Sequence, residues 1–151
     1  AADIPWVREF IRTHWGDEII VANNVVYRPH EHPGFYARLD DQLAGLITYR
    51  ILGSGCEILT LNSLLPGKGI GSALVNQVSE TAKQAGCRRL DVTTTNDNYA
   101  AIRFYENQGF FMTAVRWGAV DDARLLKPSI PLVGENGIPI QDEIVLEKIL
   151  L

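Results

Sequence analysis

The sequence has only two cysteines, no excess of basic residues and no long apolar run. Cys56 and Cys87 form neither a disulfide framework nor a metal-binding motif, so we expect two buried free thiols, as in the reducing cytosol. A net charge of −4 leaves no basic face for nucleic acid or for an anionic membrane. The apolar runs are far shorter than the ~20 residues of a membrane span. We therefore expect a cytoplasmic protein.

The length and composition predict one globular domain over residues 1–151. Apolar residues make up 46% of the chain and charged residues 21%, which is ordinary for a globular protein. A chain of this size buries about 70% of its unfolded surface. The only histidine pair close in sequence, His30 and His32, lies in a proline-bounded stretch without a third ligand. We expect a solvated loop there and no metal site.

The spacing of apolar residues and the positions of turn residues predict helices and strands in a mixed order. The predicted helices cover 4–15, 69–85, 98–108 and 120–126. The predicted strands cover 18–22, 25–27, 34–39, 42–52, 56–64, 88–95, 110–118 and 143–150. This order favours an α/β fold in which helices flank a mixed, mostly antiparallel central sheet.

A glycine-rich turn at residues 66–71 runs straight from a predicted strand into a predicted helix. The first turn of a helix has unpaired N–H groups and a positive dipole end, and glycine lets a phosphate approach them closely. The turn therefore predicts a phosphate-bearing ligand. Lys68 is followed by Gly69, which excludes the P-loop spacing, and Leu74 replaces the last glycine of the dinucleotide fingerprint.

A second motif occupies residues 96–110. It places Asn98, Ala101 and Tyr105 on one face of a helix, because these positions are three and four residues apart. Gly109 follows as the expected end of that helix. An amide, a small side chain and a phenol along one face suit a thin, amide-containing arm such as pantetheine.

Together the two motifs resemble the GNAT superfamily of acetyl-CoA-dependent N-acetyltransferases. The first matches the signature (Gln/Arg)-x-x-Gly-x-(Gly/Ala) at Gly69 and Gly71, although Pro66 replaces the usual Gln or Arg and supplies no donor. The second matches Asn-x-x-Ala-x-x-x-Tyr followed by Gly-Phe. The resemblance implies a GNAT-like sheet in which two parallel strands, here 56–64 and 88–95, splay apart at the cofactor.

The resemblance also implies acetyl-CoA as co-substrate, with no metal. Backbone N–H groups of the glycine-rich turn should hold the pyrophosphate, and the backbone of Leu61 and Ser63 should pair with the pantetheine arm. Tyr105 matches the family's usual general acid. The full set of expected cofactor residues is Leu61, Ser63, Gly67, Lys68, Gly69, Ile70, Gly71, Ser72, Asn98, Ala101 and Tyr105.

The expected reaction is direct transfer of an acetyl group to a primary amine, on a small molecule or a protein. Glu57 is the candidate general base, because alternation along its strand places it with Leu59 and Leu61 on the cleft side. A solvent-facing role for Glu57 stays open, and Asp91 is the second candidate. A non-catalytic acyl-CoA-binding sensor is the alternative function. A homodimer is compatible with the sequence, which does not fix the oligomeric state.

The long connection at 127–140 is rich in apolar residues, which argues against disorder. Asn136-Gly137 between apolar pairs predicts a hairpin turn. Two roles are open for this segment: it lines the acceptor site or a subunit contact, or it covers the core.

Overall fold

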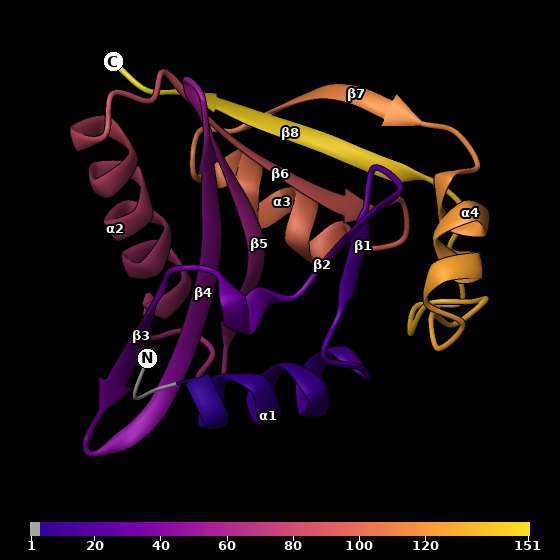
Figure 1. The fold of residues 1–151 in the computed structure, drawn as a ribbon, viewed down its shortest axis with the longest axis horizontal. Helices are drawn as coiled ribbons and strands as arrows, with labels where there is room; N and C mark the ends of the chain where they lie inside the picture. The colour runs from indigo at the N-terminus through magenta and orange to yellow at the C-terminus, as the bar shows by residue number, and fades with distance from the viewer. Residues whose placement is uncertain (1–3) are drawn as a thin grey trace.

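A computed structural model describes residues 4–151 (Figure 1). The helices are α1 (Ile4–Trp15), α2 (Ile70–Gln84), α3 (Tyr99–Asn107) and α4 (Ala119–Leu126), with a short 3₁₀ turn η1 (Pro29–Glu31). The strands are β1 (Ile20–Ala22), β2 (Val25–Tyr27), β3 (Gly34–Leu39), β4 (Gln42–Leu52), β5 (Gly55–Ser63), β6 (Arg89–Thr95), β7 (Phe111–Arg116) and β8 (Glu143–Ile149). Every predicted helix and strand is present. The loop prediction at 28–33 is wrong in one respect, because η1 forms there and buries His30.

The central sheet has the strand order β3-β4-β5-β6-β8-β7, and β1 and β2 form a separate hairpin. All neighbours in the central sheet are antiparallel except β5 and β6. The predicted mixed, mostly antiparallel sheet is therefore confirmed. The main core lies between this sheet and helices α2 and α3. Helix α1 and the β1–β2 hairpin cover the opposite face.

The parallel strands β5 and β6 pair over only four residues each. Their last pair is Ile58 with Val92. Beyond it β5 stays paired with β4 as far as Ser63, and β6 stays paired with β8 as far as Thr95. The two strands thus part from each other while each keeps its outer neighbour, which confirms the expected splay.

A shift in register between β4 and β5 reverses the alternation of side chains along β5. Thr48 pairs with Thr60 and Tyr49 pairs with Ile58, so Leu59 is an extra residue on β5. Leu59 packs with the β1–β2 hairpin, whereas Leu61 packs against the α2 side of the sheet. The parity argument that put Glu57 and Leu61 on one face is therefore wrong, because one inserted residue exchanges the faces.

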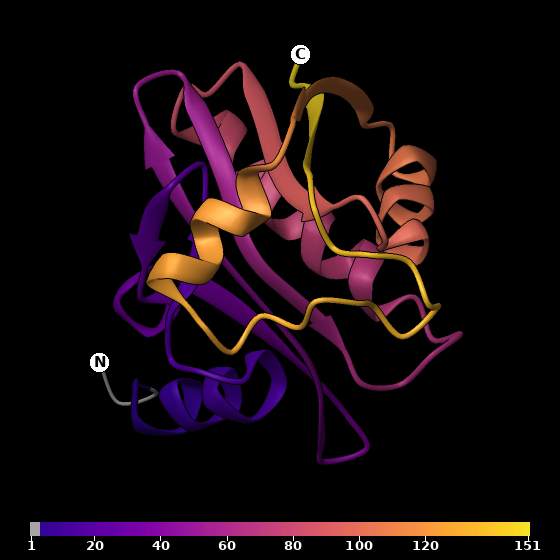
Figure 2. The same ribbon diagram turned by 90° about the vertical axis from the view of Figure 1, so that its right-hand side faces the viewer.

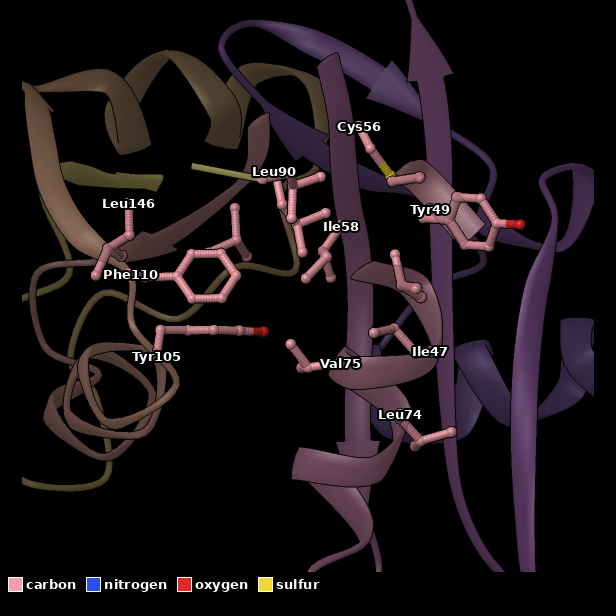
Figure 3. Packing of buried hydrophobic residues seen from close by; sticks show 14 of the residues in the cluster. Ile47, Tyr49, Cys56, Ile58, Leu74, Val75, Leu90, Tyr105, Phe110 and Leu146 are labelled. Carbon is pink, nitrogen blue, oxygen red and sulfur yellow. The ribbon is translucent and has the colours of Figure 1, made fainter. Parts of the chain in front are cut away.

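The main core joins both motif helices to the sheet. Figure 3 shows Tyr105 and Phe110 meeting Ile58, Leu90 and residues of α2 in one apolar layer.

Cys56 and Cys87 are buried free thiols, as predicted. Burial raises the pKa of the Cys56 thiol to about 12, so it stays protonated and unreactive. No helix within residues 4–151 is long and apolar enough to cross a membrane.

Candidate active site

The glycine-rich turn leaves the start of α2 open to solvent. Gly67 and Gly69 have φ angles of +76° and +72°, a conformation that favours glycine, and Gly69 is the N-cap of α2. The first helical hydrogen bond runs from Ala73 N–H to the Gly69 carbonyl at 3.0 Å. The N–H groups of residues 70–72 therefore precede the helical ladder and can donate to an anion.

Gly71 has a different role from the two glycines before it. A Cβ at Gly71 would lie 3.1 Å from Cζ of Phe104 on α3, so the glycine lets the two helices approach closely. Beside it, Gln108 Nε2 donates a hydrogen bond of 2.8 Å to Ser72 Oγ. The two sequence motifs thus contact each other through Phe104 and Gln108, which sequence reasoning did not select.

Helix α3 carries the second motif, and Asn98 and Ala101 have different structural roles in it. Asn98 is the N-cap, and its Oδ1 accepts a hydrogen bond of 3.1 Å from Ala101 N–H. Ala101 is half-buried against the main core. The motif therefore fixes where α3 begins as well as which side chains face the sheet.

Tyr105 is buried between α3, α2 and the sheet. Its ring centroid lies 5.2 Å from those of both Phe104 and Phe110 in edge-on contacts. Figure 3 shows its hydroxyl pointing from α3 toward Val75 of α2. Burial raises the pKa of Tyr105 above that of an ordinary phenol, so the hydroxyl keeps its proton throughout the usual pH range. The proton that a general acid would give is therefore present, whereas burial disfavours the phenolate that its loss would leave.

A pocket of about 180 Å³ lies where β5 and β6 part. It brings Glu57 of β5 together with Asn98 of the second motif. The pocket does not include the glycine-rich turn, Leu61, Ser63 or Tyr105, which lie along the α2 side. Its lining residues are Trp15, Ile20, Val21, Ala22, Glu57, Ile58, Leu59, Thr93, Thr94, Thr95, Asn98 and Glu143.

Three carboxylates lie in one row across the sheet beside this pocket. Glu57 on β5 is the direct neighbour of Asp91 on β6, which in turn is the neighbour of Glu147 on β8. Arg50 Nε donates to Glu57 Oε1 at 2.9 Å, whereas Arg89 Nε is 3.9 Å from Asp91 Oδ2. Sequence reasoning could not find this row, because it depends on the register of three strands.

Asp91, in the middle of the row, holds its proton to a higher pH than an ordinary aspartate does. Burial raises its pKa to about 6, the charge of Glu57 adds to this effect, and Arg89 partly opposes it. Glu57 also contacts Tyr27, whose ring lies 4.9 Å from the Arg50 guanidinium carbon. The row therefore joins the pocket-lining carboxylate of Glu57 to a neighbour whose pKa is raised.

The sequence model of the acetyltransferase (GNAT) family matches residues 4–110. The chain belongs to the GNAT family. It is an acyltransferase of the acetyltransferase type. Among curated proteins it is 46% identical to the uncharacterized protein YdhI of Bacillus subtilis (strain 168) over 143 residues, which are 94% of this chain and 89% of the relative.

Solved structures of acetyltransferases share the fold of this GNAT chain. A Bacillus subtilis acetyltransferase in complex with CoA is 27% identical, with a TM-score of 0.66 over 77% of this chain and 75% of that one. An IAA acetyltransferase from Bacillus cereus is 26% identical, with a TM-score of 0.68 over 81% of both chains. Within residues 4–151 of this acetyltransferase, no group of His, Cys, Asp and Glu is arranged to hold a metal.

The 127–140 segment of this GNAT chain is tied to the start of α3. Figure 2 shows it running from the end of α4 past α3 to β8. Asn136 Nδ2 donates to the Asp97 carbonyl at 2.7 Å, and Asn96 Nδ2 donates to the Pro139 carbonyl at 2.9 Å. The predicted hairpin turn is confirmed by the antiparallel bridge between Val133 and Pro139. The segment thus lies beside the second motif.

Replacing Asp91 by Asn should stabilise the protein at neutral pH but not in acid. The folded-state pKa of about 6 exceeds the unfolded value of 3.8, so the folded state loses stability as pH rises from about 4 to 6. Asn removes this loss, which amounts to about 1–3 kcal/mol above pH 6. Urea unfolding at pH 4 and pH 7.5 measures it, with Asp122→Asn on α4 as the control. A stability difference from the parent that does not grow with pH contradicts the assignment.

Proposed function

We propose that this chain transfers an acetyl group directly from acetyl-CoA to a primary amine. The observation that carries the proposal is the early end of β5–β6 pairing, at Ile58 and Val92, between an open helix start and a pocket lined by Glu57. The CoA complex of the similar Bacillus subtilis acetyltransferase supports CoA as the ligand.

In this proposal, successive parts of the cofactor contact α2, then β5, then the place where the strands part. Its pyrophosphate accepts hydrogen bonds from the N–H groups of residues 70–72, at the positive end of α2. Its pantetheine arm pairs with the β5 backbone at Leu61 and Ser63, where β5 no longer has β6 as a neighbour. The thioester then reaches the point where the strands part, close to Asn98 and Tyr105.

The reaction needs a neutral amine, an aligned thioester and a proton for the departing thiolate. Glu57 takes a proton from the ammonium form of the acceptor. The amine nitrogen attacks the thioester carbon, the C–N bond forms and the C–S bond breaks. Tyr105 gives its proton to the leaving sulfur, and the second proton that the nitrogen loses as the amide forms returns to the Tyr105 oxygen.

CoA binding should depend on Gly69 but not on Gly53, a glycine with similar backbone geometry in another turn. Gly69 and Gly53 both have positive φ and open space where a Cβ would stand, so valine strains both backbones alike. Only Gly69→Val places a side chain in front of the phosphate. Calorimetry should show CoA binding to the parent and to Gly53→Val and at least a tenfold loss for Gly69→Val. Equal affinity in the two variants would place the cofactor elsewhere.

Tyr105→Phe should lower kcat at least tenfold and leave acetyl-CoA affinity almost unchanged, since the hydroxyl acts only in the transition state. The assay follows release of the CoA thiol with a panel of polyamines, amino acids, aminoglycosides and peptide N-termini. The parent should turn over at least one amine class. Parental kcat in Tyr105→Phe excludes its role as the acid, whereas no thiol release with any amine in the parent contradicts amine acetylation itself.

Glu57→Gln should reduce turnover by about 10²–10⁴-fold, most strongly at low pH, where the acceptor is protonated. Its CoA affinity should equal that of the parent. Asp91→Asn is the control, because it keeps the pocket carboxylate. If the pH–rate profile of Glu57→Gln equals that of the parent, Glu57 is not the general base and has only a structural role beside Arg50.

A further inference from the structure

The pocket where β5 and β6 part has one apolar wall. This wall comes from α1, β1 and β5, and its residues belong to a single apolar cluster on the face of the sheet opposite α2. The members that line the pocket are Trp15, Ile20, Ala22 and Leu59. Contact with such a wall stabilises the apolar part of a ligand, because it removes apolar surface from water.

Trp15 is held in this wall from two sides. Its indole Nε1 donates a hydrogen bond of 2.8 Å to Asn62 Oδ1 on β5. Its carbonyl oxygen, at the end of α1, accepts a hydrogen bond of 2.8 Å from Nζ of the buried Lys127, whose charge suits the negative end of a helix. The indole is therefore a preformed surface that a ligand does not have to order.

The opposite wall of the pocket is polar. It comes from β6, β8 and the start of α3, and it includes the second carboxylate of the lining, Glu143. Glu143 Oε1 accepts hydrogen bonds from Arg116 Nε at 2.8 Å and from Asn23 N–H at 3.0 Å. The Glu143 side chain is only 4% exposed, whereas that of Glu57 is 19% exposed. Glu57 is therefore the carboxylate of the lining that the ammonium group of a ligand can reach.

The pocket has no partner for any further charge on a ligand. Within residues 4–151, neither lysine nor arginine is among its lining residues. Arg50 and Arg116, which lie beside it, already donate to Glu57 and Glu143. A ligand carboxylate or a second ammonium group would thus lose its water and gain no ion pair in return. The lining favours a ligand with one positive charge and an uncharged body.

The size of the pocket limits this body to a single ring. An apolar cavity of about 150 Å³ is enough to hold benzene. The volume of about 180 Å³ therefore accommodates one aromatic ring with a short chain. Aminoglycosides, which have several rings and several ammonium groups, exceed both limits.

We propose that the acceptor is a primary monoamine with one small aromatic ring, as in phenethylamine, and that Trp15 determines this preference. The inference rests on the proposed acetyl transfer and names the class of amine that the same pocket receives. The ring lies against the Trp15 indole, offset or edge-on, and the nitrogen faces Glu57. The ammonium ion and acetyl-CoA then give the neutral amide, the CoA thiol and one released proton.

Calorimetry at saturating CoA tests this preference with two pairs of amines that each differ by one charged group. Phenylalanine adds a carboxylate to phenethylamine, and para-xylylenediamine adds a second amine to para-methylbenzylamine. The amine with a single charge should bind at least tenfold more tightly in each pair, because the added charge has no partner in the pocket. The thiol-release assay with these four amines should give the same order of kcat/KM.

Trp15→Leu tests the role of the indole. It should weaken phenethylamine binding at least tenfold and keep the parental CoA affinity, which also shows that the variant is folded. The control is Trp117→Leu, on an indole that is 81% exposed and outside the pocket lining. It should keep the parental affinity for phenethylamine and for CoA.

The inference is overturned if either doubly charged amine binds as tightly as its partner, or if Trp15→Leu keeps the parental affinity for phenethylamine. The paired amines decide this with the parent alone, whether or not Trp15→Leu folds. Thiol release that is faster with polyamines or amino acids also overturns the inference but leaves acetyl transfer standing. Binding in the expected order without any thiol release supports the pocket assignment and contradicts the proposed acetyl transfer.

Discussion

The early end of the β5–β6 pairing is the constraint on which the site depends. If β5 and β6 stayed paired up to their last residues, the sheet would be closed there and β5 would have no free edge. Here β4 holds β5 and β8 holds β6 on their outer sides, so the two strands part without losing their other partners. The separation therefore places a polar backbone edge and a pocket inside a well-packed sheet.

The two faces of the sheet divide the proposed chemistry. On the α2 side lie the open helix start, the free β5 edge and the buried Tyr105, whose raised pKa keeps its hydroxyl protonated. On the other side lie Glu57 and Asp91, and burial and the charge of Glu57 raise the pKa of Asp91. Gly71 fits closely against Phe104 and so fixes the two motif helices relative to each other. The proposed proton acceptor and the proposed proton donor thus lie on opposite faces of the sheet.

The sequence predicts the local structure and both motifs, but not the relations across strands. Hydrophobic spacing and glycine positions were enough to predict α2, α3 and the central strands, because these signals are local. The inserted residue Leu59 leaves no local signal, so alternation assigned Glu57 and Leu61 to one face although they lie on opposite faces. The carboxylate row and the contact of Gly71 with Phe104 likewise depend on register and helix packing, which a single sequence does not reveal.

Amide hydrogen exchange with and without CoA tests most directly whether the cofactor occupies the place where the strands part. If it does, CoA slows exchange at Leu61 and Ser63 on β5 and at residues 70–72 of α2, because the ligand then accepts or covers these N–H groups. Exchange in β3, at the far edge of the sheet, should not change. Tight CoA binding without protection of Leu61 and Ser63 would contradict this placement.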